Sequence, residues 1–125
     1  MVKDRVAAPP YAPQSMPRKL KTLVIVEDFL ISKLVRAVLE KKGYPVVVAE
    51  PSDAAGLLRS EERCGILLTN SPAIFLEFAD KVPLVYLTSF PDPDLQARFR
   101  DCRVVRKPFA PGELIQAVGE LTGAY

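Results

Sequence analysis

Short apolar runs alternate with segments of helical periodicity along the chain from residue 20 onward. The run within residues 21–27 is continuously apolar, which is typical of a strand that is covered on both faces of a sheet. After each run, apolar residues recur at spacings of three and four, as they do in amphipathic helices. The pattern therefore predicts five β/α units, with strands over residues 21–27, 45–49, 65–69, 83–87 and 103–106.

The predicted helices are bounded by residues that favour helix ends. Gly43 is expected to end the first helix, and Ser71 followed by Pro72 is expected to begin the third. The others are expected to begin at Ser52, at Asp92 or Asp94, and at about Pro111, the last one running to Leu121. The residues predicted to face the core are Ile31, Leu34, Val35, Val38 and Leu39; Ala54, Leu57 and Leu58; Ile74, Phe75, Phe78 and Ala79; and Leu114, Ile115, Val118 and Leu121.

Strict alternation of strands and helices predicts an α/β fold. With right-handed crossovers it gives a flavodoxin-like, doubly wound, five-stranded parallel sheet of order 2-1-3-4-5 with about five helices. The 125 residues suffice for one domain, which we expect to span residues 20–125. Residues 1–19 are rich in proline and poor in apolar side chains, and are expected to form a disordered leader.

Composition limits the partners, the cellular compartment and the catalytic groups that the chain can have. The net charge is +2, with +4 on residues 1–21 and −2 on the remainder, which gives no argument for a nucleic-acid partner. No apolar stretch is long enough to cross a membrane, and the cysteines, Cys64 and Cys102, are expected to be reduced thiols. We therefore expect a cytoplasmic protein. The absence of histidine excludes phosphohistidine and histidine-based metal chemistry.

Polar residues follow four of the predicted strands. Glu27 and Asp28 follow the first, Asn70 the third, Thr88 the fourth and Lys107 the fifth. The carboxyl ends of parallel strands share one edge of the sheet, where open α/β sheets place their sites. The sequence predicts that these side chains gather there.

In this order, the motifs resemble the receiver domain of bacterial response regulators, the CheY-like family of two-component phosphorelay signalling. The resemblance covers residues 20–122 and rests on Val26-Glu27-Asp28, Leu87-Thr88-Ser89 and Lys107-Pro108-Phe109. It implies that Glu27 and Asp28 are the Mg²⁺-binding acids, that Thr88 senses the phosphoryl group and that Lys107 neutralises its charge.

Three departures from the family pattern occur together. Asn70 stands where the family has its phosphoacceptor aspartate, and an uncharged amide cannot serve as that nucleophile. Val104 takes the place of the aromatic switch residue, and only 18 positions separate Asn70 from Thr88, which is short for the family. We therefore expect a degenerate, stand-alone pseudo-receiver with no catalytic residue, no enzyme activity, and no cofactor beyond a weak or vestigial Mg²⁺ site.

The expected partners are other signalling proteins, a kinase or a receiver, or a second copy bound through the fourth-helix, fifth-strand and fifth-helix face. A basic stretch on that face, from Arg98 to Lys107, also suits simple solvation. Alternatives remain for the individual residues. Glu27-Asp28 could simply favour a helix N-terminus, Thr88 could cap a turn, and Asn70 could merely suit a strand-to-helix turn.

Alternatives remain for the function as well. A receiver could be phosphorylated at a non-standard residue, with Ser71 and Thr69 as the nearby hydroxyls, and a flavodoxin-like phosphate-binding protein is a second possibility. The phosphate-binding protein would need a glycine-rich or hydroxyl-rich loop after the first strand, and Glu27-Asp28-Phe29-Leu30 is acidic and bulky instead. Deamidation at Asn70-Ser71 would restore an aspartate nucleophile.

Overall fold

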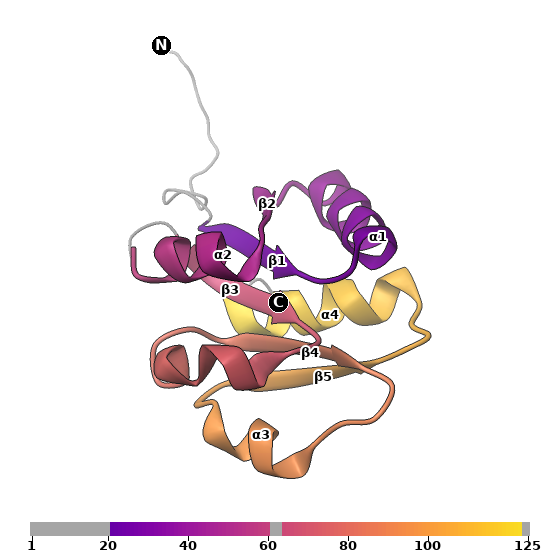
Figure 1. Ribbon diagram of the computed structural model, residues 1–125. Coiled ribbons are helices and arrows are strands. Elements are labelled where there is room, and N and C mark those ends of the chain that lie inside the picture. The colour runs from indigo at the N-terminus through magenta and orange to yellow at the C-terminus, as the bar shows by residue number, and fades with distance from the viewer. Residues whose placement is uncertain (1–20, 61–63, 124–125) are drawn as a thin grey trace.

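Five parallel strands form one sheet at the centre of the molecule (Figure 1). The computed structural model describes residues 21–60 and 64–123, so the predicted leader lies outside the described residues. The strand order is β2-β1-β3-β4-β5, which confirms the predicted topology. The strands are β1 (Thr22–Val26), β2 (Val46–Val48), β3 (Cys64–Thr69), β4 (Leu84–Thr88) and β5 (Cys102–Arg106).

Helices cover both faces of this sheet (Figure 1). One apolar core joins one face to α1 (Phe29–Lys41) and α4 (Pro111–Thr122). A second core joins the other face to α2 (Pro51–Leu58) and the 3₁₀ helix η1 (Pro72–Phe78), and it includes Phe99 at the end of α3 (Pro93–Arg98). Coverage on both faces explains why β1, β3 and β4 are almost continuously apolar, whereas the edge strand β5 contains the exposed Arg103 and Arg106.

Helix α1 confirms the predicted amphipathic pattern with one exception. Val35 and Leu39 are fully buried, but Leu34 is 46% exposed. The inward stripe instead includes Ser32, whose hydroxyl donates to the backbone carbonyl of Glu27 at 3.1 Å. Helical spacing alone could not separate Leu34 from the core stripe, because the helix has a second apolar side that faces outward.

Two predicted helix starts differ from the structure. Helix α2 begins at Pro51 and has Glu50 rather than Ser52 at its N-cap, because proline is well tolerated in the first turn. Ser71 does precede Pro72 at the start of the third helix, but that helix is a 3₁₀ helix with a kink at Phe75. The kink leaves Ile74 56% exposed, whereas Phe75 and Phe78 are buried as predicted.

Other predicted helix boundaries are confirmed. Gly43 follows α1 with a φ of 93°, in the left-handed region that glycine adopts without strain. Asp92 caps α3, and its carboxylate accepts from the backbone N–H groups of Asp94 and Leu95.

Both cysteines are free thiols at the first positions of β3 and β5. Burial raises the pKa of Cys64 and of Cys102 to about 11. The neutral thiol is therefore strongly favoured at ordinary pH, as expected for structural rather than reactive cysteines.

Candidate functional site

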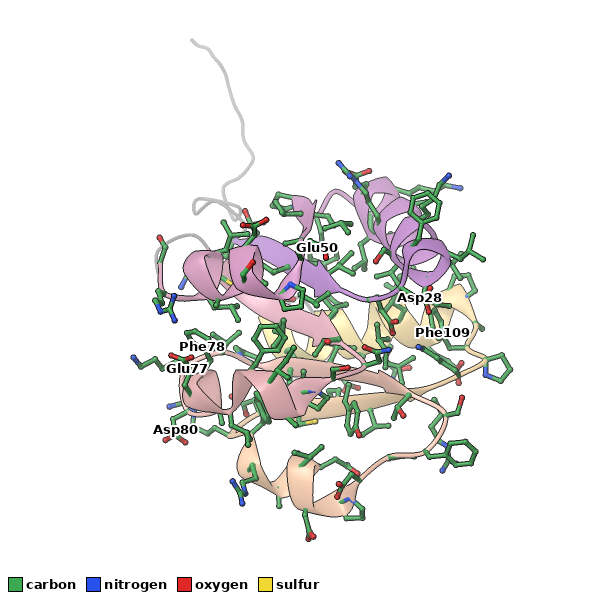
Figure 2. All side chains as sticks on the ribbon, viewed as in Figure 1. Asp28, Glu50, Glu77, Phe78, Asp80 and Phe109 are labelled. Atoms are coloured by element: carbon green, nitrogen blue, oxygen red, sulfur yellow. The ribbon has the colours of Figure 1, made fainter. Side chains whose placement is uncertain are left out.

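Strand register brings the predicted site residues to one edge of the sheet. Val26 pairs with Thr69, and Thr88 pairs with Arg106. Glu27 and Asn70 therefore leave neighbouring strands at the same level, and Thr88 and Lys107 end the other two strands. Figure 2 shows Asp28 and Phe109 at this end of the sheet, opposite Glu77 and Asp80.

Lys107 and Glu27 form a buried ion pair. The Nζ atom of Lys107 lies 2.7 Å from Oε2 of Glu27. The Glu27 side chain is 0% exposed and that of Lys107 is 20% exposed. Because β3 and β4 lie between β1 and β5, the pair spans the carboxyl ends of both inner strands, beside the positions of Asn70 and Thr88.

Local hydrogen bonds hold Glu27 in place. Its Oε1 atom accepts from the backbone N–H of Asp28 at 3.0 Å, and its carbonyl accepts from Ser32 on α1. Oε2 has no well-aligned hydrogen-bond donor among the residues that the structure describes, so the nearby Lys107 ammonium is its main charge compensation. Sequence reasoning missed Ser32, whose signal was a small hydroxyl residue on the inward side of α1.

Asp28 caps the N-terminus of α1, which was the alternative role open to the acidic pair. Its Oδ1 atom accepts from the backbone N–H of Ile31 at 2.9 Å, and its φ and ψ of −64° and 166° are those of an N-cap residue. The exposed carboxylate thus caps α1 and lies close to the buried acid that precedes it.

Asn70 is exposed, and its two neighbours in the chain, Thr69 and Ser71, form hydrogen bonds at this turn. Its Oδ1 atom accepts from Ser71 Oγ at 3.1 Å. The backbone N–H of Ser71 donates to Oγ1 of Thr69 at 3.0 Å, and Thr69 is fully buried. The Ser71 side chain therefore does not cap the following helix, and the turn after β3 is fixed by Thr69.

Thr88 shows the turn-capping role that its sequence also allowed. Its Oγ1 atom accepts from the backbone N–H of Phe90 at 3.1 Å. Its carbonyl accepts from the backbone N–H of Lys107 at 3.0 Å, which fixes the start of the lysine segment against β4. The Lys107-Pro108 peptide bond is cis.

The oxygens available at this edge do not suit a Mg²⁺ ion. A hard divalent cation needs several free oxygen ligands, usually including carboxylates. Both oxygens of Glu27 are engaged, one oxygen of Asp28 caps α1, and Asn70 contributes no charge. Within residues 21–60 and 64–123, no group of three or more acidic or thiol side chains could hold a metal ion.

Comparisons with known proteins agree on the fold. No model of a protein family matches the chain, and no curated protein matches its sequence. Among solved structures, the chemotaxis response regulator CheY4 of Vibrio cholerae matches with a TM-score of 0.67 and 18% identity, over 82% of this chain and 99% of that one. A response regulator receiver protein from Sinorhizobium medicae matches with a TM-score of 0.68 and 18% identity, over 85% and 97%. A response regulator from Thermotoga maritima gives 0.66 and 20%, over 84% and 99%. The chain thus shares the CheY-like receiver fold.

Proposed function

We propose that this receiver-like chain is a pseudo-receiver of two-component signalling that acts by binding other proteins without being phosphorylated. The proposal starts from the shared fold and from the residues at the carboxyl edge of the sheet. It assigns no enzyme activity to the chain and places it in the cytoplasm of a bacterial cell.

Asn70 is the observation that carries the proposal. It directly follows β3, level with Glu27, at the position where the receiver pattern has its phosphoacceptor aspartate. An amide oxygen carries no negative charge, so it cannot form the acyl phosphate by which a receiver is switched. Its exposure leaves it accessible to a phosphodonor, so lack of reaction would reflect its chemistry.

The charges near Asn70 support a site that stays unphosphorylated. Lys107 already compensates Glu27 at 2.7 Å, and Oδ1 of Asn70 is satisfied by Ser71. Because the buried acid is compensated by a lysine of the same protein, no metal or phosphoryl group is needed to relieve repulsion there. The edge is therefore suited to holding one conformation.

The partner is another signalling protein, a kinase or a receiver, that contacts the face formed by α3, β5 and α4. β5 is an edge strand, and α3 contributes no buried residue of its own, so Cys102 and Val104 are only half-buried. Exposed arginines flank this surface, namely Arg98, Arg100 and Arg106. Exposed acids, among them Asp92, Asp94 and Asp101, lie on or beside the same elements, so the face is of mixed charge and suits a partner with a mixed polar surface. Nucleic acid and membrane are not assigned as partners.

Incubation with acetyl phosphate and Mg²⁺, followed by intact mass measurement, tests the proposal. We expect no phosphoryl adduct under conditions that label an ordinary receiver. An adduct on the wild type would reject the pseudo-receiver.

A Ser71→Ala variant separates the second candidate function, phosphorylation at a non-standard residue. Ser71 is the exposed hydroxyl next to Asn70, whereas Thr69 is fully buried and its hydroxyl accepts a backbone hydrogen bond. An adduct that disappears in Ser71→Ala would support that candidate. An adduct that survives the substitution would point to another residue.

A further inference from the structure

Asn70 is the only asparagine among the 125 residues, and it is followed by serine. An exposed asparagine before a small residue is prone to deamidation. At this position the product would be an aspartate, the residue that a phosphoryl acceptor requires. The chemical lifetime of a single amide therefore determines how long the chain keeps its uncharged site.

The reaction needs the backbone nitrogen of the following residue. In deamidation, the Ser71 nitrogen loses its proton and attacks Cγ of Asn70, forming a new N–C bond. The Cγ–Nδ2 bond breaks and the side-chain nitrogen leaves as ammonia. Water then opens the succinimide ring to give aspartate or isoaspartate at residue 70. No oxidant or other co-reactant is required.

The structure engages this nitrogen in a hydrogen bond. The backbone N–H of Ser71 donates to Oγ1 of Thr69 at 3.0 Å. The accepting hydroxyl is on the last residue of β3, which is fully buried and paired with Val26 and Tyr86 on either side. To attack Asn70, the nitrogen must give up this bond, lose its proton and turn toward Cγ. A buried partner on a central strand makes that rearrangement costly.

The Ser71 hydroxyl, in contrast, favours deamidation. Ser71 Oγ donates to Oδ1 of Asn70 at 3.1 Å, which polarises the amide carbonyl and favours attack on Cγ. The electrophile is thus activated while the nucleophile is held back. Of these two hydrogen bonds, only the one to Thr69 opposes the reaction.

We propose that Thr69 is a positioning residue that preserves Asn70 as an amide by holding the Ser71 nitrogen in this hydrogen bond. The inference rests on the proposed function for its biological meaning, because it prolongs the uncharged state of residue 70. Loss of the bond would slowly place a carboxylate beside Glu27 and Asp28. The chain would then acquire the three acids of a receiver by ageing alone.

The test compares Thr69→Val with Thr69→Ser and with the wild type. Valine keeps the buried shape of threonine but removes the hydroxyl, whereas serine keeps the hydroxyl. Each protein is held at mildly alkaline pH, and the acidic form is followed by ion exchange and by the mass of the peptide containing residue 70. Because the chain has one asparagine, new acidic forms arise chiefly at that site, and Asn70→Asp provides the marker.

We expect Thr69→Val to deamidate about tenfold faster than the wild type, which corresponds to about 1.4 kcal/mol, the size of one ordinary hydrogen bond. Thr69→Ser should remain close to the wild-type rate. In strong urea, where the native bond is absent, all three rates should become equal and faster than the native wild-type rate.

Equal native rates for Thr69→Val and the wild type would overturn the inference, provided that circular dichroism shows both proteins folded. If Thr69→Val does not fold, a native wild-type rate equal to its rate in urea would overturn it instead. Neither outcome bears on the acetyl phosphate experiment, so the failure of this inference and the failure of the proposed function are distinguishable.

Discussion

At the scale of single residues, Glu27 is the group that depends most on its partner. Its carboxylate is fully buried and Lys107 Nζ is 2.7 Å away. We expect Lys107→Met to lower the free energy of unfolding by about 2–3 kcal/mol, less than the ~3–5 kcal/mol of fully buried pairs because the lysine is partly exposed. Urea denaturation measures this loss.

A double-mutant cycle gives the control for this prediction. Glu27→Gln combined with Lys107→Met should recover part of the lost stability, because no charge is then left buried. The more exposed pair of Arg103 with Glu120, at 2.8 Å, is a matched comparison, and Arg103→Gln should cost clearly less stability than Lys107→Met because solvent screens this pair. Equal losses for Lys107→Met and Arg103→Gln would contradict the importance of burial.

Asn70 determines the charge at the carboxyl edge. Asn70→Asp changes the sum over Glu27, Asp28, residue 70 and Lys107 from −1 to −2. We expect the variant to lose about 1 kcal/mol in the presence of chelator, or about 4 °C in Tm, and to recover with Mg²⁺. Thermal melts with and without Mg²⁺ measure both effects, and the wild type should respond little. Equal Tm values for the two proteins in chelator would count against this reading of the edge.

The buried Cys64 thiol, which lies away from the candidate site, should make the free energy of unfolding depend on pH. Burial raises the pKa of Cys64 to about 11 from an ordinary value of 9.0. The unfolded chain therefore loses its proton first as pH rises, and stability should fall between about pH 9 and 11. Denaturation of Cys64→Ala over this range should show a shallower decline than the wild type. Cys102→Ser should do the same, because burial also raises the pKa of Cys102 to about 11. An unchanged slope in Cys64→Ala would assign the decline to other groups.

At the scale of elements, α1 separates apolar residues that look equivalent in the sequence. Leu34 and Val35 are adjacent, yet Leu34 is half-exposed and Val35 is fully buried. We expect Leu34→Ala to change the free energy of unfolding by less than about 0.5 kcal/mol. Val35→Ala should cost about 2–3 kcal/mol by creating a cavity in the core. Similar losses for the two variants would show that Leu34 packs against the core after all.

Helix α4 has half of a capping box. The Glu113 side chain accepts from the backbone N–H of Ala110 at 2.8 Å. Alanine has no side-chain oxygen, so the Glu113 N–H donates to the Ala110 carbonyl at 3.0 Å instead. Ala110 is exposed and has the extended φ and ψ of −87° and 149° that suit an N-cap. Ala110→Ser should therefore raise stability by about 0.5–1 kcal/mol, measured as a higher Tm. Ala110→Val is the control and should give no gain.

Element ends were harder to predict than element types. Apolar runs identified all five strands because both faces of the sheet are covered. The kink that exposes Ile74 and the helix start at Pro51 depend on packing and on local backbone geometry, which periodicity does not report. Likewise, the sequence identified Thr69 only as a hydroxyl near Asn70 that could be phosphorylated. Its bond to Ser71 appears only when the turn after β3 is built.

At the scale of the whole molecule, strand order was the most predictable feature and the pairing at the edge the least. The alternation of strands and helices, with right-handed crossovers, leaves few topologies, and the observed order is one of them. The expectation that the polar side chains gather at one edge does not say whether Lys107 pairs with Glu27 or with Asp28. Capping of α1 engages Asp28, so the choice depends on a helix end that composition does not reveal.

The ion pair between Lys107 and Glu27 also bears on kinetics. It joins the end of the first strand to the residue after the last strand, so it can close only when the intervening strands are assembled. Closing so long a stretch of chain costs loop entropy, so we expect this contact to form after the folding barrier has been crossed. We therefore expect the ion pair to slow unfolding and to leave the refolding rate nearly unchanged.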